Sequence, residues 1–168
     1  VDDAQAVLHW LHQMQGVLPF ASSKVLLGGD SAGGHLALAT AVRAVLQPHT
    51  AHAQIQALLL LYPCLLPDLT TPSVQAFAQG YGLTDAAMHQ YWQALGGADD
   101  ALRTPSLCTA ALPWLPPTAI MTASHDILRD EAENFAHQLQ ALPQGPHCVL
   151  QRADGMVHGF ARMRTASP

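Results

Sequence analysis

The stretch GGDSAGG, residues 28–34, places one serine among four glycines between two apolar segments. The short β-like run KVLL, at 24–27, precedes it, and a run of helical length and composition, at 35–46, follows it. Residues 29–33 fit the pattern Gly-x-Ser-x-Gly, in which a serine stands at the tip of a sharp turn from strand to helix. The pattern favours an α/β fold in which Ser31 is an exposed nucleophile.

The glycines around Ser31 suit a sharp turn. The backbone at such a turn is strained, so we expect side chains at Gly29, Gly33 and Gly34 to collide with it. The first amides of the following helix point toward the serine, and the N–H of Ala32 is placed to stabilise an oxyanion. The spacing fits neither a Walker loop, which needs Lys and Ser or Thr after its second glycine, nor the GxGxxG dinucleotide fingerprint.

The rest of the chain alternates between strand-like and helix-like segments. We expect strands at 24–27, 55–62, 118–124 and 148–152, and helices at 3–15, 35–46, 85–95 and 131–142. Two segments rich in proline and small residues, 64–83 and 96–117, are predicted loops. The alternation predicts βαβ units, an open parallel sheet covered on both faces, and a single domain over residues 1–168.

Three local patterns make finer structural predictions. The continuous apolar run at 55–62 is typical of a strand buried on both faces of a parallel sheet. Thr84 is the predicted N-cap of the helix that follows it. Asp130, with Glu133 three residues later, predicts a capping box at the start of the helix 131–142.

Charge and cysteine usage exclude several classes of partner. The net charge is −5, with a single lysine and six scattered arginines, so no basic stripe indicates nucleic acid or an anionic membrane. No apolar run approaches the roughly 20 residues that span a membrane. The spacing of Cys64, Cys108 and Cys148 favours reduced, buried thiols over a disulfide framework or a zinc site. We expect a cytoplasmic protein without metal or organic cofactor, and the oligomeric state stays open.

Candidate partners for Ser31 lie near the ends of two later strands. A serine hydroxyl becomes a nucleophile when a histidine takes its proton and a carboxylate orients that histidine. In such folds the order along the chain is Ser, then Asp or Glu, then His, each just past the carboxyl end of a strand. Asp126 and His158 meet both conditions. We predict a triad of Ser31, Asp126 and His158, with Asp154 as the alternative acid.

The other acidic and histidine side chains have ordinary structural interpretations. Asp30 is expected to point away from a histidine that faces the serine, and Asp130 and Glu131 to cap a helix. We expect surface positions for six histidines: His9, His12, His49, His52, His89 and His137.

These segments together resemble the bacterial hormone-sensitive-lipase-like (family IV) esterases of the α/β-hydrolase superfamily. GDSAGG (29–34), DILRDE (126–131) and VHGF (157–160) are similar to that family's nucleophile, acid and histidine motifs, and the resemblance covers nearly the whole chain. It implies Ser31 as nucleophile, Asp126 as acid and His158 as base. It also implies a carboxylesterase that cleaves short to medium acyl esters through an acyl-enzyme and needs no cofactor.

The chain departs from the family in what it lacks. It contains no HGGG-type oxyanion segment, N-terminal strands or cap, so we expect the C-terminal half of an α/β-hydrolase fold. That half is a mostly parallel, doubly wound sheet of about four strands with flanking helices, whose segment 24–27 forms an exposed apolar edge. Losing one oxyanion donor costs about 100- to 1,000-fold in rate, so we expect little esterase activity from this chain alone. A smaller departure is His35, where the family usually has asparagine.

Two other functions stay open. A serine peptidase or amidase on the same fold would use the same three residues, and its cap and pocket would set the substrate class. A non-catalytic ligand receptor on this scaffold is the third hypothesis. Such receptors typically lack the catalytic histidine, whereas His158 is present in its motif.

Overall fold

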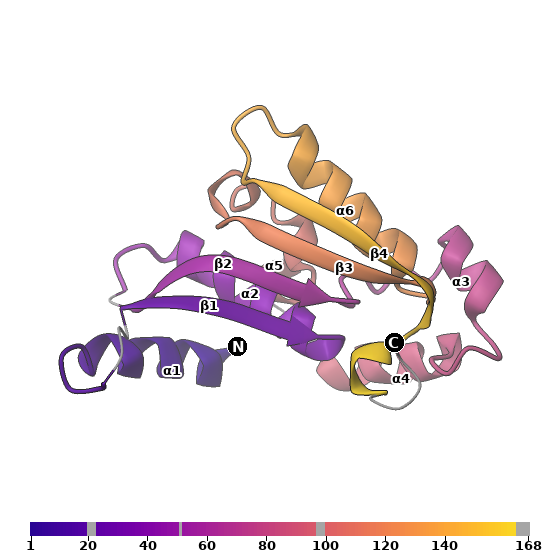
Figure 1. Ribbon diagram of the computed structural model, residues 1–168, viewed down its shortest axis with the longest axis horizontal. Coiled ribbons are helices and arrows are strands. Elements are labelled where there is room, and N and C mark those ends of the chain that lie inside the picture. The colour runs from indigo at the N-terminus through magenta and orange to yellow at the C-terminus, as the bar shows by residue number, and fades with distance from the viewer. Residues whose placement is uncertain (20–22, 51, 97–99, 164–168) are drawn as a thin grey trace.

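A single sheet of four parallel strands, in the order β1-β2-β3-β4, forms the centre of the protein (Figure 1). The computed structural model describes residues 1–19, 23–50, 52–96 and 100–163. The strands are β1 (Lys24–Asp30), β2 (Gln54–Leu61), β3 (Thr118–His125) and β4 (Cys148–Val157). The helices are α1 (Asp2–Gln13), α2 (Ala32–Leu46), α3 (Pro72–Phe77), α4 (Asp85–Leu95), α5 (Asp100–Arg103) and α6 (Arg129–Ala141). Short 3-10 turns lie at Pro105–Leu107, Leu112–Trp114 and Phe160–Arg162.

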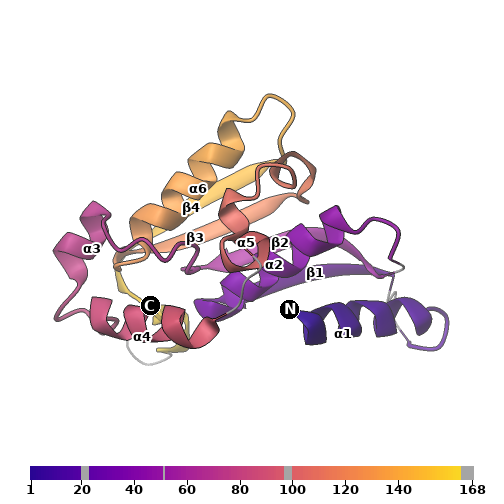
Figure 2. The same cartoon turned by 180° about the vertical axis from the view of Figure 1, so that it is seen from behind.

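The order of the strands explains where α2 and α6 lie. Crossovers between parallel strands are right-handed, and these strands follow one another in chain order, so both crossover helices fall on the same face. Figure 2 shows α2 and α6 together in front of the sheet. The main core lies between this face and the two helices, and its members include Leu38, Val42, Leu58, Leu60, Ile120, Phe135 and Leu139.

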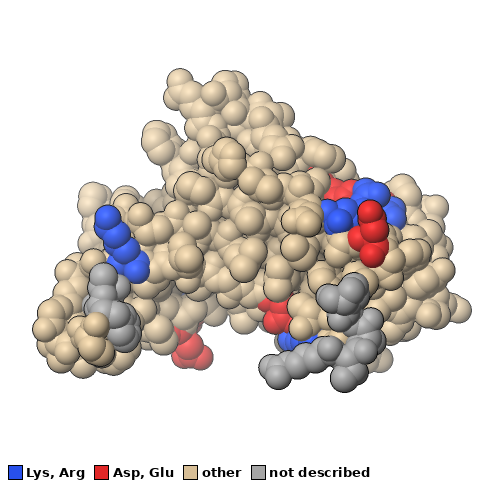
Figure 3. Space-filling model, in the orientation of Figure 1, with Lys and Arg blue, Asp and Glu red and all other residues tan. Residues whose placement is uncertain are grey.

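The opposite face of the sheet is apolar and exposed. Leu59, Ala119 and Val149 pair in register across three strands, and Leu59 and Val149 are each 49% exposed. Leu26, on the edge strand β1, is 79% exposed. Figure 3 shows few charged side chains over the strands on this face. Within the described residues, the predicted apolar edge at 24–27 is confirmed, and the prediction that 55–62 is buried on both faces is wrong.

The strands and helices next to the predicted triad are longer than the sequence indicates. β1 continues through both glycines to Asp30, and α2 begins directly after Ser31. β4 continues to Val157, the residue before His158. The regular structure therefore reaches the candidate site residues themselves.

The two predicted loops contain regular structure. The helix α3 lies within 64–83, while α5 and two 3-10 turns lie within 96–117. Helices this short have too few turns to show a hydrophobic period. The predicted N-cap is confirmed, because the Thr84 hydroxyl accepts a hydrogen bond from the N–H of Ala87 at 3.2 Å.

The predicted capping box is wrong. The helix α6 already begins at Arg129, and no side chain caps its start. The Asp130 carboxylate instead accepts a hydrogen bond from the backbone N–H of Ser73, 2.7 Å away. Glu133 forms an ion pair with Arg152 of β4. Both carboxylates have partners far away in the sequence, which a local pattern does not reveal.

Two further predictions concern cysteines and membranes. Cys64, Cys108 and Cys148 are free, but each is only partly buried, so the expectation of fully buried thiols is wrong. Among the described helices, none combines the length and the apolar character that crossing a membrane requires.

Candidate active site

Ser31 occupies a strained turn between β1 and α2. Its backbone has φ 54° and ψ −120°, and within the described ranges only Tyr62 shares a positive φ among non-glycine residues. Side chains rarely adopt such a conformation unless their surroundings enforce it. Here the N–H of Ser31 donates to the carbonyl of Leu61 at 2.9 Å, and its carbonyl accepts from the N–H of His35 at 3.2 Å. The end of β2 and the first turn of α2 therefore hold the serine in place.

We expected side chains at Gly29, Gly33 and Gly34 to collide with the turn, and this is correct for Gly29 and Gly34. A Cβ at Gly29 would lie 2.2 Å from the backbone of Gly33, and a Cβ at Gly34 would lie 2.8 Å from Cβ of Pro63. A Cβ at Gly33 would meet nothing nearer than Oδ1 of Asp30, at 3.9 Å. The steric reason is therefore wrong for Gly33, whose backbone is the surface that Gly29 approaches.

The fold brings the three predicted triad residues into one hydrogen-bonded chain. Nε2 of His158 lies 2.9 Å from Oγ of Ser31, and Nδ1 of His158 lies 2.7 Å from Oδ2 of Asp126. Asp126 is 1% exposed, and its other oxygen accepts from the N–H of Leu128 at 2.9 Å. The carboxylate bonded to the histidine is thus Asp126 and not the alternative, Asp154. Parallel strands bring these residues together because their carboxyl ends share one edge of the sheet.

Tyr62 packs against His158, a contact that no sequence pattern indicates. Its ring meets the rings of His158 and Phe160 edge to face, with centroids 5.0 Å and 5.3 Å away. Burial raises the pKa of Tyr62, and the nearby Asp30 carboxylate acts in the same direction. The neutral tyrosine therefore packs its aromatic ring beside the imidazole.

The polar side of Ser31 opens into a cavity of about 350 Å³ that Ala32, Tyr62 and His158 also line. Ala32 is the first residue of α2, and N–H groups in the first turn of a helix have no partner within it. Asp30 is paired with Arg162, whose Nη2 lies 2.6 Å from Oδ2 of Asp30. Its carboxylate is thus engaged away from the imidazole, as the sequence predicts.

The other side of Ser31 borders an apolar pocket of about 280 Å³. Leu36 from α2, Cys64 from the segment after β2, and Met88 and Trp92 from α4 contribute to its lining. Burial raises the pKa of Cys64 to about 12, so this thiol is neutral at ordinary pH. The pocket can hold a small apolar group directly beside the serine hydroxyl.

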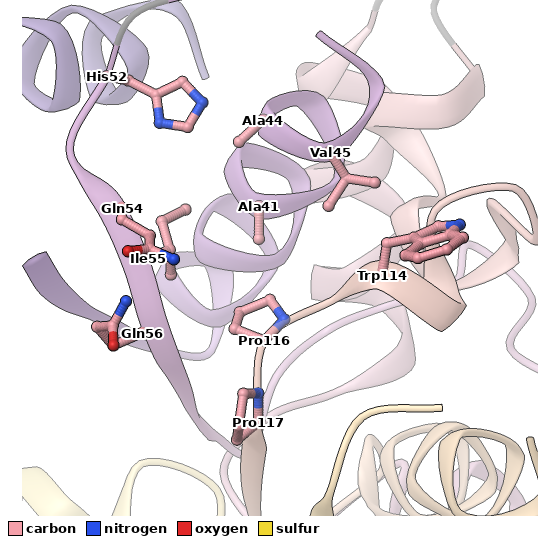
Figure 4. Close-up of a pocket in the computed structure, with 10 residues that line it drawn as sticks. All are labelled: Ala41, Ala44, Val45, His52, Gln54, Ile55, Gln56, Trp114, Pro116 and Pro117. Carbon is pink, nitrogen blue, oxygen red and sulfur yellow. The ribbon is translucent and has the colours of Figure 1, made fainter. Parts of the chain in front are cut away.

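A further cavity, of about 490 Å³ and of mixed polar and apolar lining, lies at the opposite end of the sheet (Figure 4). Ala41 of α2, Ile55 near the start of β2, and Trp114, Pro116 and Pro117 ahead of β3 line it. These are the amino ends of the strands, whereas the predicted triad lies at their carboxyl ends. This cavity is therefore separate from the candidate active site.

Glu131 is a buried carboxylate that the sequence wrongly assigns to helix capping. It is 3% exposed, and its Oε1 accepts a hydrogen bond from the N–H of Leu65 at 2.6 Å. Burial raises its pKa to about 8, although the hydrogen bonds from Leu65 and Leu66 act in the opposite direction. The first turn of α6 therefore holds the segment after β2 through this side chain.

The described residues contain no group of three or more His, Cys, Asp or Glu side chains that could hold a metal ion. The candidate site thus consists of the Ser31 hydroxyl, the His158 imidazole and the Asp126 carboxylate, hydrogen-bonded in that order. One polar cavity and one apolar pocket flank the serine. Chemically, the site can activate the hydroxyl for attack on a carbonyl carbon.

Comparison with known proteins identifies the family. A family model described as alpha/beta hydrolase fold matches residues 1–162, and the chain belongs to this family. The resemblance to hormone-sensitive-lipase-like esterases, and with it the α/β-hydrolase fold, is confirmed.

The relatives include several named esterases. The chain is 32% identical to carboxylesterase NlhH of Mycobacterium tuberculosis, over all of this chain and 53% of the relative. It is 28% identical to an arylesterase of Saccharolobus solfataricus, over 95% of this chain and 52% of the relative. The crystal structure of a thermostable esterase from Pseudomonas putida matches with a TM-score of 0.85 and 27% identity, over 95% of this chain and 50% of the other. The chain thus spans about half the length of the relatives it matches, and it is a carboxylesterase-like α/β hydrolase.

Proposed function

We propose that the protein is a serine carboxylesterase in which Ser31, His158 and Asp126 form the catalytic triad. The observation that carries this proposal is the continuous chain of hydrogen bonds from Oγ of Ser31 through His158 to the buried Asp126. The esterases among its relatives support the substrate class.

In the first half of the reaction, Oγ of Ser31 forms a bond to the ester carbonyl carbon and gives its proton to Nε2 of His158. The N–H of Ala32 donates to the oxyanion that forms. The tetrahedral intermediate then breaks its bond to the alkoxide, which takes the proton from His158 and leaves as an alcohol. In the second half, water attacks the acyl-enzyme, His158 takes and returns its proton, and the acid is released.

Asp126 orients the imidazole in this scheme. Its carboxylate accepts the Nδ1–H of His158, which leaves Nε2 free to accept the serine proton. Because Asp126 is almost completely buried, its charge acts on the imidazolium with little screening by water.

The substrates we propose are esters with a short to medium acyl chain. The apolar pocket beside Ser31, at about 280 Å³, is at the small end of the range for ligand pockets. Its volume suits a chain of a few carbons.

The direct test is covalent labelling of the full-length protein with a fluorophosphonate, together with hydrolysis of p-nitrophenyl butyrate. We expect Ser31→Ala to abolish both, because the nucleophilic oxygen is removed. Ser106→Ala is the matched control, since Ser106 is a buried serine whose hydroxyl donates to the carbonyl of Leu65. Labelling that persists in Ser31→Ala, or is lost equally in Ser106→Ala, would contradict the proposal.

A further inference from the structure

His35 lies one helical turn after Ser31, and both of its ring nitrogens face backbone carbonyls. Nδ1 lies 3.1 Å from the carbonyl oxygen of Cys64, and Nε2 lies 3.1 Å from the carbonyl oxygen of Leu102. The side chain is 3% exposed. One buried imidazole thus connects α2 to the segment after β2 and to α5.

The protonation state of this ring limits what it can hold. A neutral imidazole has one N–H and therefore donates to one of the two carbonyls at a time. Burial lowers the pKa of His35, although the carbonyls of Cys64 and Leu102 act in the opposite direction. The neutral ring therefore predominates at ordinary pH, and its tautomer decides which carbonyl receives the hydrogen bond.

The groups that His35 contacts are also groups that form the apolar pocket. Its ring meets the ring of Trp92 edge to face, with centroids 5.4 Å apart. Trp92, Cys64 and His35 itself line the pocket beside Ser31. The N–H of Cys64 lies 3.4 Å from the carbonyl oxygen of Ser31, so the segment after β2 bonds to both ends of this helical turn. A shift of the His35 ring would therefore change the width of the pocket, whereas the ring itself makes no hydrogen bond to Ser31, His158 or Asp126.

We propose that His35 is a positioning residue that sets the width of the apolar pocket and thereby the preferred length of the apolar arm of the substrate. This inference rests on the proposed esterase function. The apolar arm is either the acyl chain or the alcohol part of the ester. Esters that vary in the acyl chain alone, and esters that vary in the alcohol alone, show which of these parts enters the pocket.

The test measures kcat and KM of the full-length protein on two ester series. One series varies the acyl chain, from p-nitrophenyl acetate to octanoate, and the other varies the alcohol, from ethyl to hexyl acetate. His35→Phe keeps a ring beside Trp92 but removes both ring nitrogens, and with them the hydrogen bond to a carbonyl. His89→Phe is the matched control, since His89 is exposed on α4, the helix that carries Trp92.

We expect His35→Phe to raise KM about three- to tenfold for the longest esters of one series, the range that loss of a single hydrogen bond gives. KM for the shortest ester and kcat for the whole series should stay within about twofold, because the triad is untouched. His35→Asn retains a donor on a shorter side chain, so it should show the same pattern with a smaller rise even if His35→Phe does not fold.

Equal losses for short and long esters would assign His35 a purely structural role and overturn the proposal. Unchanged KM values in both His35 variants would overturn it as well. Failure of the esterase proposal is a separate result, since it appears as activity that survives Ser31→Ala.

Discussion

The turn at 28–34 and the turn at 126–131 hold their functional residues by opposite means. The first, which carries Ser31, depends on missing side chains: a Cβ at Gly29 would lie 2.2 Å from the backbone of Gly33. The second, which carries Asp126, depends on buried carboxylates. Three carboxylates at this turn each accept a hydrogen bond from a backbone N–H, with Asp126, Asp130 and Glu131 bonded to Leu128, Ser73 and Leu65.

The difference predicts different sensitivities. The serine turn should respond to added volume, because its backbone already makes contacts that leave no room for a side chain. The acid turn should respond to changes in charge and protonation, because Asp126 and Glu131 are buried and all three carboxylates are hydrogen-bonded. Substitutions that change only volume or only charge test this contrast.

The largest effect is expected for Asp126→Asn, which removes charge at almost constant volume. The amide presents the wrong group to His158, so kcat for p-nitrophenyl butyrate should fall by about 10³- to 10⁴-fold with the fold retained. Glu131→Gln is the control, since it also replaces a buried carboxyl group by an amide, five residues later and without touching His158. A loss of similar size in both variants would show that the turn as a whole, and not the bond to His158, matters.

The next largest effect is expected for Gly29→Ala, which adds volume without charge. The new methyl group must displace the backbone of Gly33, at a cost of about 1–3 kcal/mol in the free energy of unfolding. Gly33→Ala is the matched control, because its methyl group has space and Ala favours a helix over Gly by about 0.5–1 kcal/mol. Denaturant unfolding of both variants tests the contrast, which fails if their stabilities change in the same direction.

A third effect, a pH dependence of stability, is expected for Glu131→Gln. The pKa of Glu131 is raised to about 8 in the folded protein from its ordinary value of 4.5, so the folded state binds the proton more tightly than the unfolded state. Its contribution to stability is therefore lost as pH rises between these two values, with a limiting slope of about 1.4 kcal/mol per pH unit. Unfolding free energies measured between pH 5 and pH 8 should fall for the wild type relative to Glu131→Gln, and parallel curves would contradict this.

The sequence predicts the sheet well because strand and helix patterns repeat over many residues. The four strands, the N-cap at Thr84 and the proximity of Ser31, Asp126 and His158 all follow from such patterns or from motif order. The same local reasoning misassigns Asp130 and Glu131 to capping, because their partners Ser73 and Leu65 lie 57 and 66 residues away.

The contacts of His35 and Tyr62 are missed for a related reason. Each side chain meets groups that come close only when separate segments pack together, and nothing in the flanking residues indicates this. The only sequence signal for His35 is that the family usually has asparagine at this position. That signal marks the residue as unusual but does not indicate which groups it contacts.

The separation between Ser31 and His158 has a consequence for how the protein folds. The two side chains are 127 residues apart in the sequence, and two further strands lie between the strands that carry them. Closing so long a loop is entropically costly, so this contact forms only after the intervening parallel strands have paired. During synthesis His158 leaves the ribosome long after Ser31. The two residues follow β1 and β4, so a sheet that still lacks β4 does not bring them together. Recovery of Ser31 reactivity during refolding therefore reports completion of the whole sheet, later than any signal from the helices.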